Sequence, residues 1–312
     1  MSHTRAEFLR RAVGLLAGAG LLSLAGCGGR VETSNTASGE LADVEQPRLT
    51  IGFLPITCAT PIIMAAPLRI YEKYGLDITV KKFSGWAKTR DAAIAGEIDA
   101  AHLLAPIPIT TSLGARSTLS APLRLAAVEN VNGSALTLAM KHLGNVESPA
   151  DLAGMRLAIP FEFSIHNLLL RAYLASGGLD ATDVDLPVMR PPDMVANLKL
   201  ENIDGFFVAD PFNQRAVYEG ADYIHLLSKE MWDGHPCCSF SVRQTFIDEN
   251  PRTYQTLLQT IVEATNYSQK VENREEIAEA IAPTEYLNQP PEVVKAVLAG
   301  HFDNGRGETI DG

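Results

Sequence analysis

Short apolar segments alternate with amphipathic segments along the first hundred residues. Gly75 and Gly96 follow the amphipathic segments, where glycine commonly ends a helix. The pattern predicts strands at 48–55, at 76–82 and from Gly96 to Pro106, with helices up to about Tyr74 and at 87–95. An order of strand, helix, strand, helix and strand predicts a parallel sheet with right-handed crossovers.

The same order occurs a second time, beginning near Ser148. It predicts a short helix after Ser148, strands at 155–160 and ending at Met189, helices at 164–176 and 193–200 with a turn at Pro191-Pro192, and a strand at 205–209. Both sets end in an Ile-Asp pair, an apolar strand and a proline. From Pro251 the chain is mostly helical in pattern, and the Gly- and Asp-rich residues 302–312 extend no helix.

Two similar sets of elements predict an α/β fold with two lobes. We place residues 47–138 and 234–312 in the first lobe and residues 139–233 in the second. Ligands of open α/β sheets bind beyond the carboxyl ends of the strands, so two facing lobes predict a ligand cleft between them. We expect the lobes to close by a hinge movement near Leu138 and Gly234.

The N-terminus has the pattern of a lipoprotein leader. Arg5, Arg10 and Arg11 lie near an apolar run that ends in Leu-Ala-Gly-Cys at Cys27. The run is too short to span about 30 Å of hydrocarbon. We predict a signal peptide at 1–26, lipidation of Cys27 and a flexible linker at 27–46, which places the protein in the periplasm or at the cell surface.

Two features of the leader stay open. A plain secretory cleavage site beside an ordinary Cys27 thiol is the alternative to lipidation. The export route is also open, because Ala6 stands where a twin-arginine signal needs its second arginine.

Charge excludes one class of partner. The chain carries a formal net charge of −11, and the leader holds three Arg and one Glu, a net +2, so the mature chain carries −13. An acidic chain argues against nucleic acid as a partner. It does not exclude an anionic ligand, because local helix N-termini and polar groups determine what a cleft binds.

Several runs, taken in order with the leader, resemble one family. They are Gly-Phe-Leu-Pro-Ile-Thr, Tyr-Gly-Leu-Asp, Gly-Trp-Ala-Lys-Thr-Arg-Asp, Gly-Glu-Ile-Asp-Ala-Ala-His, Ser-Pro-Ala-Asp-Leu-Ala-Gly and Asp-Pro-Phe-Asn-Gln-Arg-Ala. The chain resembles periplasmic solute-binding proteins of the nitrate, sulfonate and bicarbonate ABC importers, closest to the nitrate/bicarbonate branch. The resemblance implies a type II periplasmic-binding-protein fold, a small inorganic anion as ligand, an ABC permease and ATPase as partners, and no catalysis.

The resemblance also implies a set of ligand contacts from both lobes: Trp86, Ser134, His166, Pro191, Val208, Asp210 and Cys238. Members that bind nitrate have glutamine, glutamate and lysine at the positions of Ser134, Asp210 and Cys238. Without that lysine, His166 is the matched side chain that can offer positive charge. The ligand therefore stays open among nitrate, nitrite, bicarbonate and a sulfonate.

Each aromatic candidate has a structural alternative. Trp86 either offers its indole N–H to an anion or packs between the lobes. His166 lies in a first helical turn, where free backbone N–H groups favour an anion, or it is an ordinary surface histidine. His102, in the strand 100–104 next to the expected mouth, is either a ligand contact or a core residue.

Asp210 follows the apolar strand 205–209, so its carboxylate is expected at the cleft. A carboxylate repels an anion unless it binds a cation or accepts a proton from the ligand. Bicarbonate carries such a proton, and a calcium ion bound at Asp210 is the metal that we consider if bicarbonate is the ligand. In the alternative, Asp210 caps the following helix.

The cysteines allow more than one interpretation. Cys237 and Cys238 are adjacent, Cys58 is a candidate disulfide partner, and their redox state is not fixed by the sequence. Buried thiols at a cleft wall are the alternative, and His235 alone gives weak support for a metal site.

Two other functions are weighed against import. Cys237-Cys238 and His166 are similar to features of a pyrimidine-precursor synthase that shares the two-lobed fold. A ligand sensor that docks to a partner would also need lobe closure. The lipoprotein leader favours import over both.

Overall fold

The computed structural model describes residues 41–115, 122–180, 182–220 and 222–311. The predicted signal peptide, the lipidation site Cys27 and the linker up to residue 40 lie outside the described residues. Within the described ranges, no helix combines the length and the apolar character needed to cross a bilayer.

The last part of the predicted linker is held against the folded body. The Ala42 N–H donates to the Gly75 carbonyl over 2.9 Å. The Glu45 carboxylate accepts from Arg252 Nε at 3.1 Å and from the Thr253 N–H at 2.9 Å. These contacts lower the pKa of Glu45 to about 2, although burial opposes the shift. Where it is described, the predicted linker is therefore an ordered extension of the body.

The first sheet has five strands in the order β2-β1-β3-β9-β4. Its strands are β1 (Arg48–Phe53), β2 (Asp77–Lys82), β3 (Ala100–Leu104), β4 (Leu123–Val131) and β9 (Pro236–Arg243). Strand β1 runs parallel to β2 and β3, as the alternating pattern predicts. Strand β9 returns from the second lobe and pairs antiparallel with β3 and β4.

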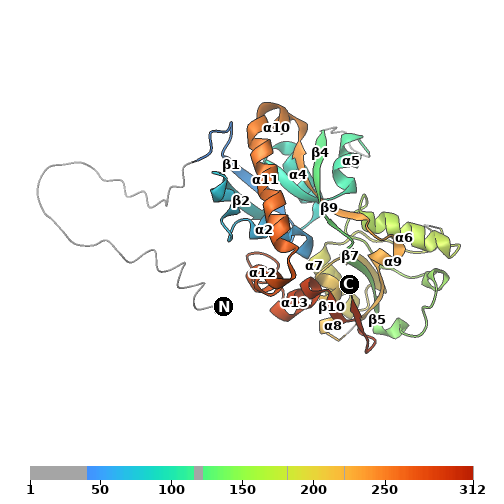
Figure 1. Ribbon diagram of the computed structural model, residues 1–312. Helices are drawn as coiled ribbons and strands as arrows, with labels where there is room; N and C mark the ends of the chain where they lie inside the picture. The colour runs from blue at the N-terminus through green and yellow to red at the C-terminus, as the bar shows by residue number, and fades with distance from the viewer. Residues whose placement is uncertain (1–40, 116–121, 181, 221, 312) are drawn as a thin grey trace, which may run out of the picture. The chain divides into compact units, whose positions relative to one another are not determined.

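Helices flank the first sheet on both faces (Figure 1). They are η1 (Thr57–Ala59), α2 (Thr60–Met64), α3 (Ile70–Lys73), α4 (Trp86–Ala95), α5 (Pro106–Ser112), α10 (Gln244–Glu249), α11 (Pro251–Ser268), η4 (Val271–Asn273), α12 (Arg274–Ile281) and α13 (Pro291–Ala299). The helix predicted up to Tyr74 is divided into α2 and α3, because Arg69 takes a left-handed φ of 57°. Helix α11 buries Leu257 and Ile261 in the same core as Ile51 of β1.

The second sheet has four strands in the order β6-β7-β5-β8. Its elements are β5 (Ser134–Ala139), β6 (Leu157–Ala158), β7 (Gly205–Ala209), β8 (Asp222–Leu227), η2 (Met140–His142), η3 (Pro149–Leu152), α6 (Ile165–Ser176), α7 (Pro191–Lys199), α8 (Phe212–Tyr218) and α9 (Ser228–Met231). Strands β6 and β7 are parallel, and β5 is antiparallel to β7 and β8. Pro191 and Pro192 begin α7 instead of forming the predicted turn, since proline suits a first helical turn.

Two predicted strands of this lobe are shorter than expected. The strand at 155–160 is reduced to the two residues of β6. In place of the strand expected to end at Met189, the structure has two isolated β-bridges, which join Arg156 to Asp185 and Ile159 to Val188.

The internal similarity predicted from the sequence is present in the two sheets. Strand β3 lies between a parallel partner, β1, and an antiparallel partner, β9. Strand β7 likewise lies between parallel β6 and antiparallel β5. Both strands lead into a proline, Pro106 and Pro211, at the edge where the lobes meet.

The chain passes between the sheets at two neighbouring points. Asn132 and Gly133 join β4 to β5, so the predicted boundary at Leu138 falls inside a strand of the second sheet. Asp233 and Gly234 precede β9 on the way back. The two passages are tied together: Asn132 Oδ1 accepts from the Gly234 N–H, and Asn132 Nδ2 donates to Asp233 Oδ1, both at 3.0 Å.

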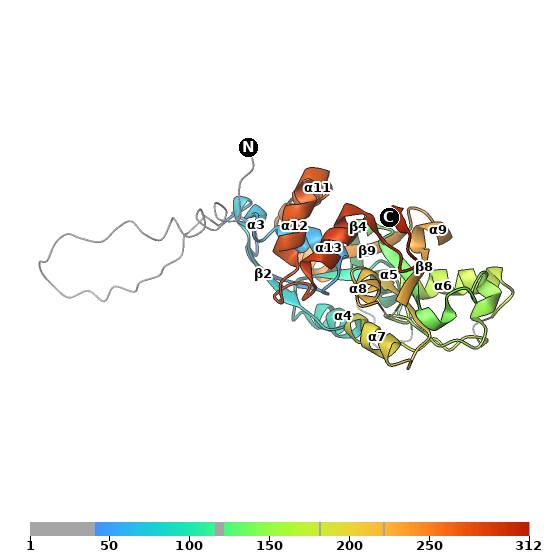
Figure 2. The same ribbon diagram turned by 90° about the horizontal axis from the view of Figure 1, so that it is seen from below.

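The C-terminal segment returns to the second sheet, whereas the sequence pattern assigned all of 234–312 to the first lobe. Strands β10 (His301–Asp303) and β11 (Thr309–Asp311) form a hairpin. Phe302 packs in a cluster with Ile224 and Leu227. The Ile224 N–H donates to the Asn304 carbonyl over 2.8 Å. The buried phenyl ring explains the placement, because it completes an apolar cluster on the second lobe. Figure 2 shows the red C-terminal end close to β8 and α9.

Candidate functional site

The predicted site residues lie on both lobes and are buried. Trp86 begins α4, His102 lies in β3 and Cys238 in β9 of the first sheet. The second lobe contributes Ser134 at the start of β5, His166 in the first turn of α6, Pro191, Val208 and Asp210. Each of these side chains belongs to a residue less than 9% exposed.

Ser134 joins the two lobes. Its Oγ lies 3.0 Å from His166 Nε2 and 3.6 Å from the Sγ of Cys237 on the first sheet. The start of α6 fixes the position of His166, because the Ser164 side chain caps the helix by accepting from the Asn167 N–H. His166 also contacts the Phe207 ring edge-on, with centroids 5.4 Å apart. His166 is only 1% exposed, so the surface alternative is wrong.

Trp86 and His102 form a second group in the first lobe. Their ring centroids are 5.6 Å apart. Among the described residues, Trp86 Nε1, both ring nitrogens of His102 and Nδ1 of His166 have no hydrogen-bond partner. Buried polar atoms are normally paired, so these nitrogens are the groups available to a bound solute.

His102 contributes no positive charge at neutral pH. Burial lowers its pKa to about 4. The Oε2 atom of Glu129, on β4, lies 3.8 Å from His102 Nε2, and both side chains are fully buried. Burial raises the pKa of Glu129 well above its ordinary value. The two groups therefore face one another as a neutral pair.

Asp210 connects the lobes through its backbone. Its carbonyl accepts from the Thr57 N–H at 3.0 Å and from Thr57 Oγ1 at 3.1 Å. Burial raises the pKa of its carboxyl group to about 7, against the opposing contacts of Asn213 and the Gln214 backbone. Since Asn213 and Gln214 lie in the first turn of α8, the carboxyl group also contacts the helix start, as the capping alternative expects.

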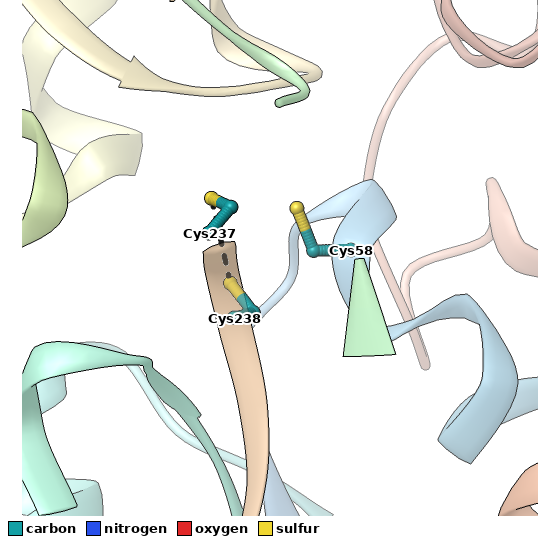
Figure 3. Close-up of side chains that lie close together, drawn as sticks. All are labelled: Cys58, Cys237 and Cys238. Carbon is teal, nitrogen blue, oxygen red and sulfur yellow. Dashed lines mark hydrogen bonds between the residues drawn. The ribbon is translucent and has the colours of Figure 1, made fainter. Parts of the chain in front are cut away.

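Three cysteines lie close together (Figure 3), and one of them, Cys237, contacts Ser134. Cys58 lies on η1, beyond the end of β1, and Cys237 and Cys238 begin β9. All three are free and buried, and their sulfur atoms lie within 4.8 Å of one another. Asn130 Nδ2 donates to the Cys58 sulfur at 3.0 Å. The disulfide alternative is therefore absent from this structure, and buried thiols at the cleft are what it contains.

The thiols differ in acidity. Contacts with Cys238 and Cys58 hold the pKa of Cys237 well below its ordinary value. The proximity of Cys237 raises the pKa of Cys58, and burial raises that of Cys238. A negative charge on Cys237 also acts on His102 and Asp210, whose pKa values it raises.

Pro191 and Val208 are connected to the other candidate residues less directly. The Val208 carbonyl accepts from Asn213 Nδ2 at 2.8 Å. Pro191 is the buried first residue of α7. No hydrogen bond within the described part of the chain joins either residue to Ser134 or His166.

A cavity at the surface has a lining that includes none of these residues. It has a volume of about 900 Å³, and its lining includes Lys88, Arg90, Thr111, Phe161 and Phe163. It therefore brings α4 and α5 of the first lobe together with the segment that precedes α6. The predicted site residues lie deeper, in the buried region between the sheets.

Sequence reasoning did not include Thr57, Glu129 and Asn130 among the site residues. Thr57 follows the carboxyl end of β1 just as Asp210 follows that of β7, so the same rule would have found it. Glu129 and Asn130 carried no such signal, because β4 is an antiparallel strand that the pattern did not predict.

Two α/β lobes that meet around buried polar side chains define the two-lobed fold of periplasmic solute-binding proteins. The crystal structure of the periplasmic nitrate-binding protein NrtA from Synechocystis PCC 6803 is similar, with a TM-score of 0.82 and 29% identity, over 86% of this chain and 74% of that one. The predicted fold class is confirmed.

The model of the NMT1-like family matches residues 42–282, so the chain belongs to that family. The nitrate/nitrite binding protein NrtA of Nostoc sp. PCC 7120 is 34% identical over 88% of this chain. The bicarbonate transport ATP-binding protein CmpC of Synechocystis sp. PCC 6803 is 30% identical over 78% of this chain. The chain spans 66% of the length of that NrtA and 38% of that CmpC. These matches confirm the resemblance found in the sequence.

Proposed function

We propose that this protein is the solute-binding subunit of an ABC importer and that it encloses a small oxyanion, nitrate, nitrite or bicarbonate, between its lobes. The relatives named for nitrate or nitrite binding and for bicarbonate transport support this class of ligand. They also favour binding over the pyrimidine-precursor synthase alternative, because their names refer to binding and transport.

The observation that carries the proposal is the interlobe contact of Ser134. Its hydroxyl group lies between His166 of the second lobe and Cys237 of the first. Unpaired nitrogens of Trp86 and His166 are buried in the same region. Hydroxyl, indole and imidazole groups can each donate a hydrogen bond to an oxyanion. A solute that binds them would be shielded from water and would hold the lobes together.

Asp210 is the group that distinguishes the anions. Nitrate has acceptors only, so it needs the protonated carboxyl group as a donor. Bicarbonate carries a proton that an ionised Asp210 could accept. With a pKa of about 7, Asp210 is present in both forms near neutral pH. A calcium ion beside Asp210 would need further oxygen ligands. Asn213 turns its amide nitrogen toward Asp210, with Nδ2 donating to Oδ1 at 3.3 Å, while its Oδ1 accepts from Thr137.

Delivery completes the proposed function. The predicted leader at 1–26 and lipidation of Cys27 would tether the mature protein to the membrane, outside the cytoplasm. The permease and ATPase subunits of the importer would then recognise the closed form. A sensor that docks to a different partner would use the same closure.

Calorimetric titration of the mature chain tests the ligand. Nitrate, nitrite, bicarbonate and an alkanesulfonate are compared, each with and without calcium, after reduction of the thiols and removal of metal ions with a chelator. We expect saturable binding of one of the three small oxyanions. Binding of the sulfonate alone, or of none of the four, would contradict the proposal.

Variants locate the site. Ser134→Ala and His166→Ala should each weaken anion binding at least about tenfold, by loss of a buried charge-assisted hydrogen bond. His301→Ala removes an exposed histidine and is the matched control. In a Trp232→Phe background, Trp86 is the only tryptophan of the chain, so its fluorescence should change saturably with the anion.

A further inference from the structure

We propose that Cys58, Cys237 and Cys238 form a binding site for a thiophilic metal ion of the Zn²⁺ or Cu⁺ class. The site adjoins Ser134, which lies 3.6 Å from Cys237, and it includes Cys238 of the predicted anion contacts, but it does not depend on the identity of the anion.

The spacing of the sulfur atoms fits such an ion. All three lie within 4.8 Å of one another, and Cys237 and Cys238 are 3.8 Å apart. Zinc to sulfur bonds of about 2.3 Å require sulfur atoms about 3.8 Å apart in tetrahedral geometry and about 4.0 Å apart in trigonal geometry. Small rotations of side chains would therefore close the site around one ion.

Polar donors surround the sulfur atoms. Asn130 Nδ2 donates to Cys58 at 3.0 Å, and Ser134 Oγ lies 3.6 Å from Cys237. Donors of this kind stabilise thiolates and orient metal ligands from outside the coordination sphere. An apolar pocket, in contrast, would favour neutral thiols.

The chemistry of the ligand set selects the ion. Sulfur ligands favour Zn²⁺ and Cu⁺ over Ca²⁺ and Mg²⁺, which prefer oxygen. Each thiol that binds as a thiolate releases its proton, so metal binding should release protons into the medium.

The position of the site gives it access to the second lobe. The three cysteines belong to the first lobe, and Ser134 and His166 face them from the second. A fourth coordination position would therefore point toward the interlobe region.

Metal binding to the reduced protein, in the absence of any added anion, tests the inference. Zn²⁺ and Cu⁺ are titrated separately in competition with a chromophoric chelator, and Co²⁺ serves as a spectroscopic probe. We expect one ion per chain, a thiolate-to-cobalt charge-transfer band and proton release. Cys58→Ser, Cys237→Ser and Cys238→Ser should each lower the affinity more than about tenfold, since loss of even an outer partner costs about 10–100-fold.

Two controls keep the outcome clear. Ser239→Ala makes a change of similar size at a buried position of β9 and should retain the metal. His301→Ala tests the exposed His301–Asp311 pair as a rival site. No binding to reduced wild type, equal binding by the serine variants, or loss only in His301→Ala would overturn the inference. Metal-free protein that still binds an anion would leave the proposed function intact, and metal binding without anion binding would refute that function alone.

Discussion

At the scale of single residues, burial decides what each side chain can offer a solute. His102 and Glu129 lie 3.8 Å apart with both side chains fully buried, and burial shifts both pKa values so that the neutral forms are favoured. Burial likewise favours the neutral form of Asp210, because it raises the pKa of the carboxyl group to about 7. Hydrogen-bond donors and a titratable carboxyl group, more than fixed positive charge, therefore define the site.

The stability of the protein should depend on Asp210 near neutral pH. Its carboxyl pKa rises from 3.8 in the unfolded chain to about 7 in the fold. The neutral carboxyl group stabilises the fold fully below pH 3.8, and its contribution to the free energy of unfolding is lost as the pH rises through 7. Between pH 4 and pH 8, this group should lower the free energy of unfolding of the wild type by about 3–4 kcal/mol, and the Asp210→Asn variant should not show that decrease. Chemical denaturation across this pH range measures the difference.

Asp222 provides the control for that experiment. Burial raises its pKa to about 7 as well, although it is not at the site. Asp222→Asn should flatten the stability profile without changing the pH dependence of anion binding, whereas Asp210→Asn should change both. Identical stability profiles for Asp210→Asn and wild type would contradict the assignment.

The sequence located individual site residues better than their contacts. Asp210 and Trp86 could be placed because each follows the end of a strand or a strand-ending loop. The contact of Ser134 with Cys237 could not be predicted, because it depends on how two lobes far apart in sequence meet. His166 could be placed at a helix start, but its burial could not.

At the scale of elements, the parallel strands were predictable and most antiparallel ones were not. Strands β1, β2, β3 and β7 are apolar or alternating runs next to recognisable helices. Strand β9 contains two cysteines and two serines, and it is buried on both faces, so it has no polar alternation. The predicted hinge position at Leu138 falls inside β5 because β4 and β5 were missed, whereas the other predicted position, Gly234, lies at the return passage.

Asn132 should stabilise the paired passages through its side chain and its left-handed backbone. Its φ is 57°, and its amide group bonds to both Asp233 and Gly234. Asn132→Ala should destabilise the protein by about 1–3 kcal/mol, because alanine tolerates this φ poorly. Asn132→Gly should lower the free energy of unfolding by less than Asn132→Ala in a denaturant titration, since glycine adopts this backbone conformation without strain. A glycine variant less stable than the alanine variant would contradict the backbone contribution.

The C-terminal hairpin should contribute to the stability of the second lobe. Phe302 is 8% exposed and packs with Ile224 and Leu227. Phe302→Ala should lower the free energy of unfolding by about 3 kcal/mol, as for other buried aromatic truncations. Val271→Ala, at a position 71% exposed, is the control and should cost less than about 0.5 kcal/mol. Equal thermal shifts for the two variants would show that the hairpin packs only weakly.

At the scale of the whole molecule, two sheets joined by neighbouring passages can move about one hinge. Asn132 and Gly234 lie in those passages, and Ser134 of the second lobe contacts Cys237 of the first. A ligand that contacts both lobes binds the closed form more tightly and so shifts the population toward it. In the proposed function, closure would be the physical link between the buried residues and delivery to an importer.

Small-angle X-ray scattering of the mature chain, with and without a saturating oxyanion, tests this link most directly. We predict a smaller radius of gyration with nitrate, nitrite or bicarbonate, and no change for His166→Ala. An unchanged radius in wild type with an anion that calorimetry shows to be bound would contradict closure around the ligand. Equal compaction of the His166→Ala variant would place the anion elsewhere.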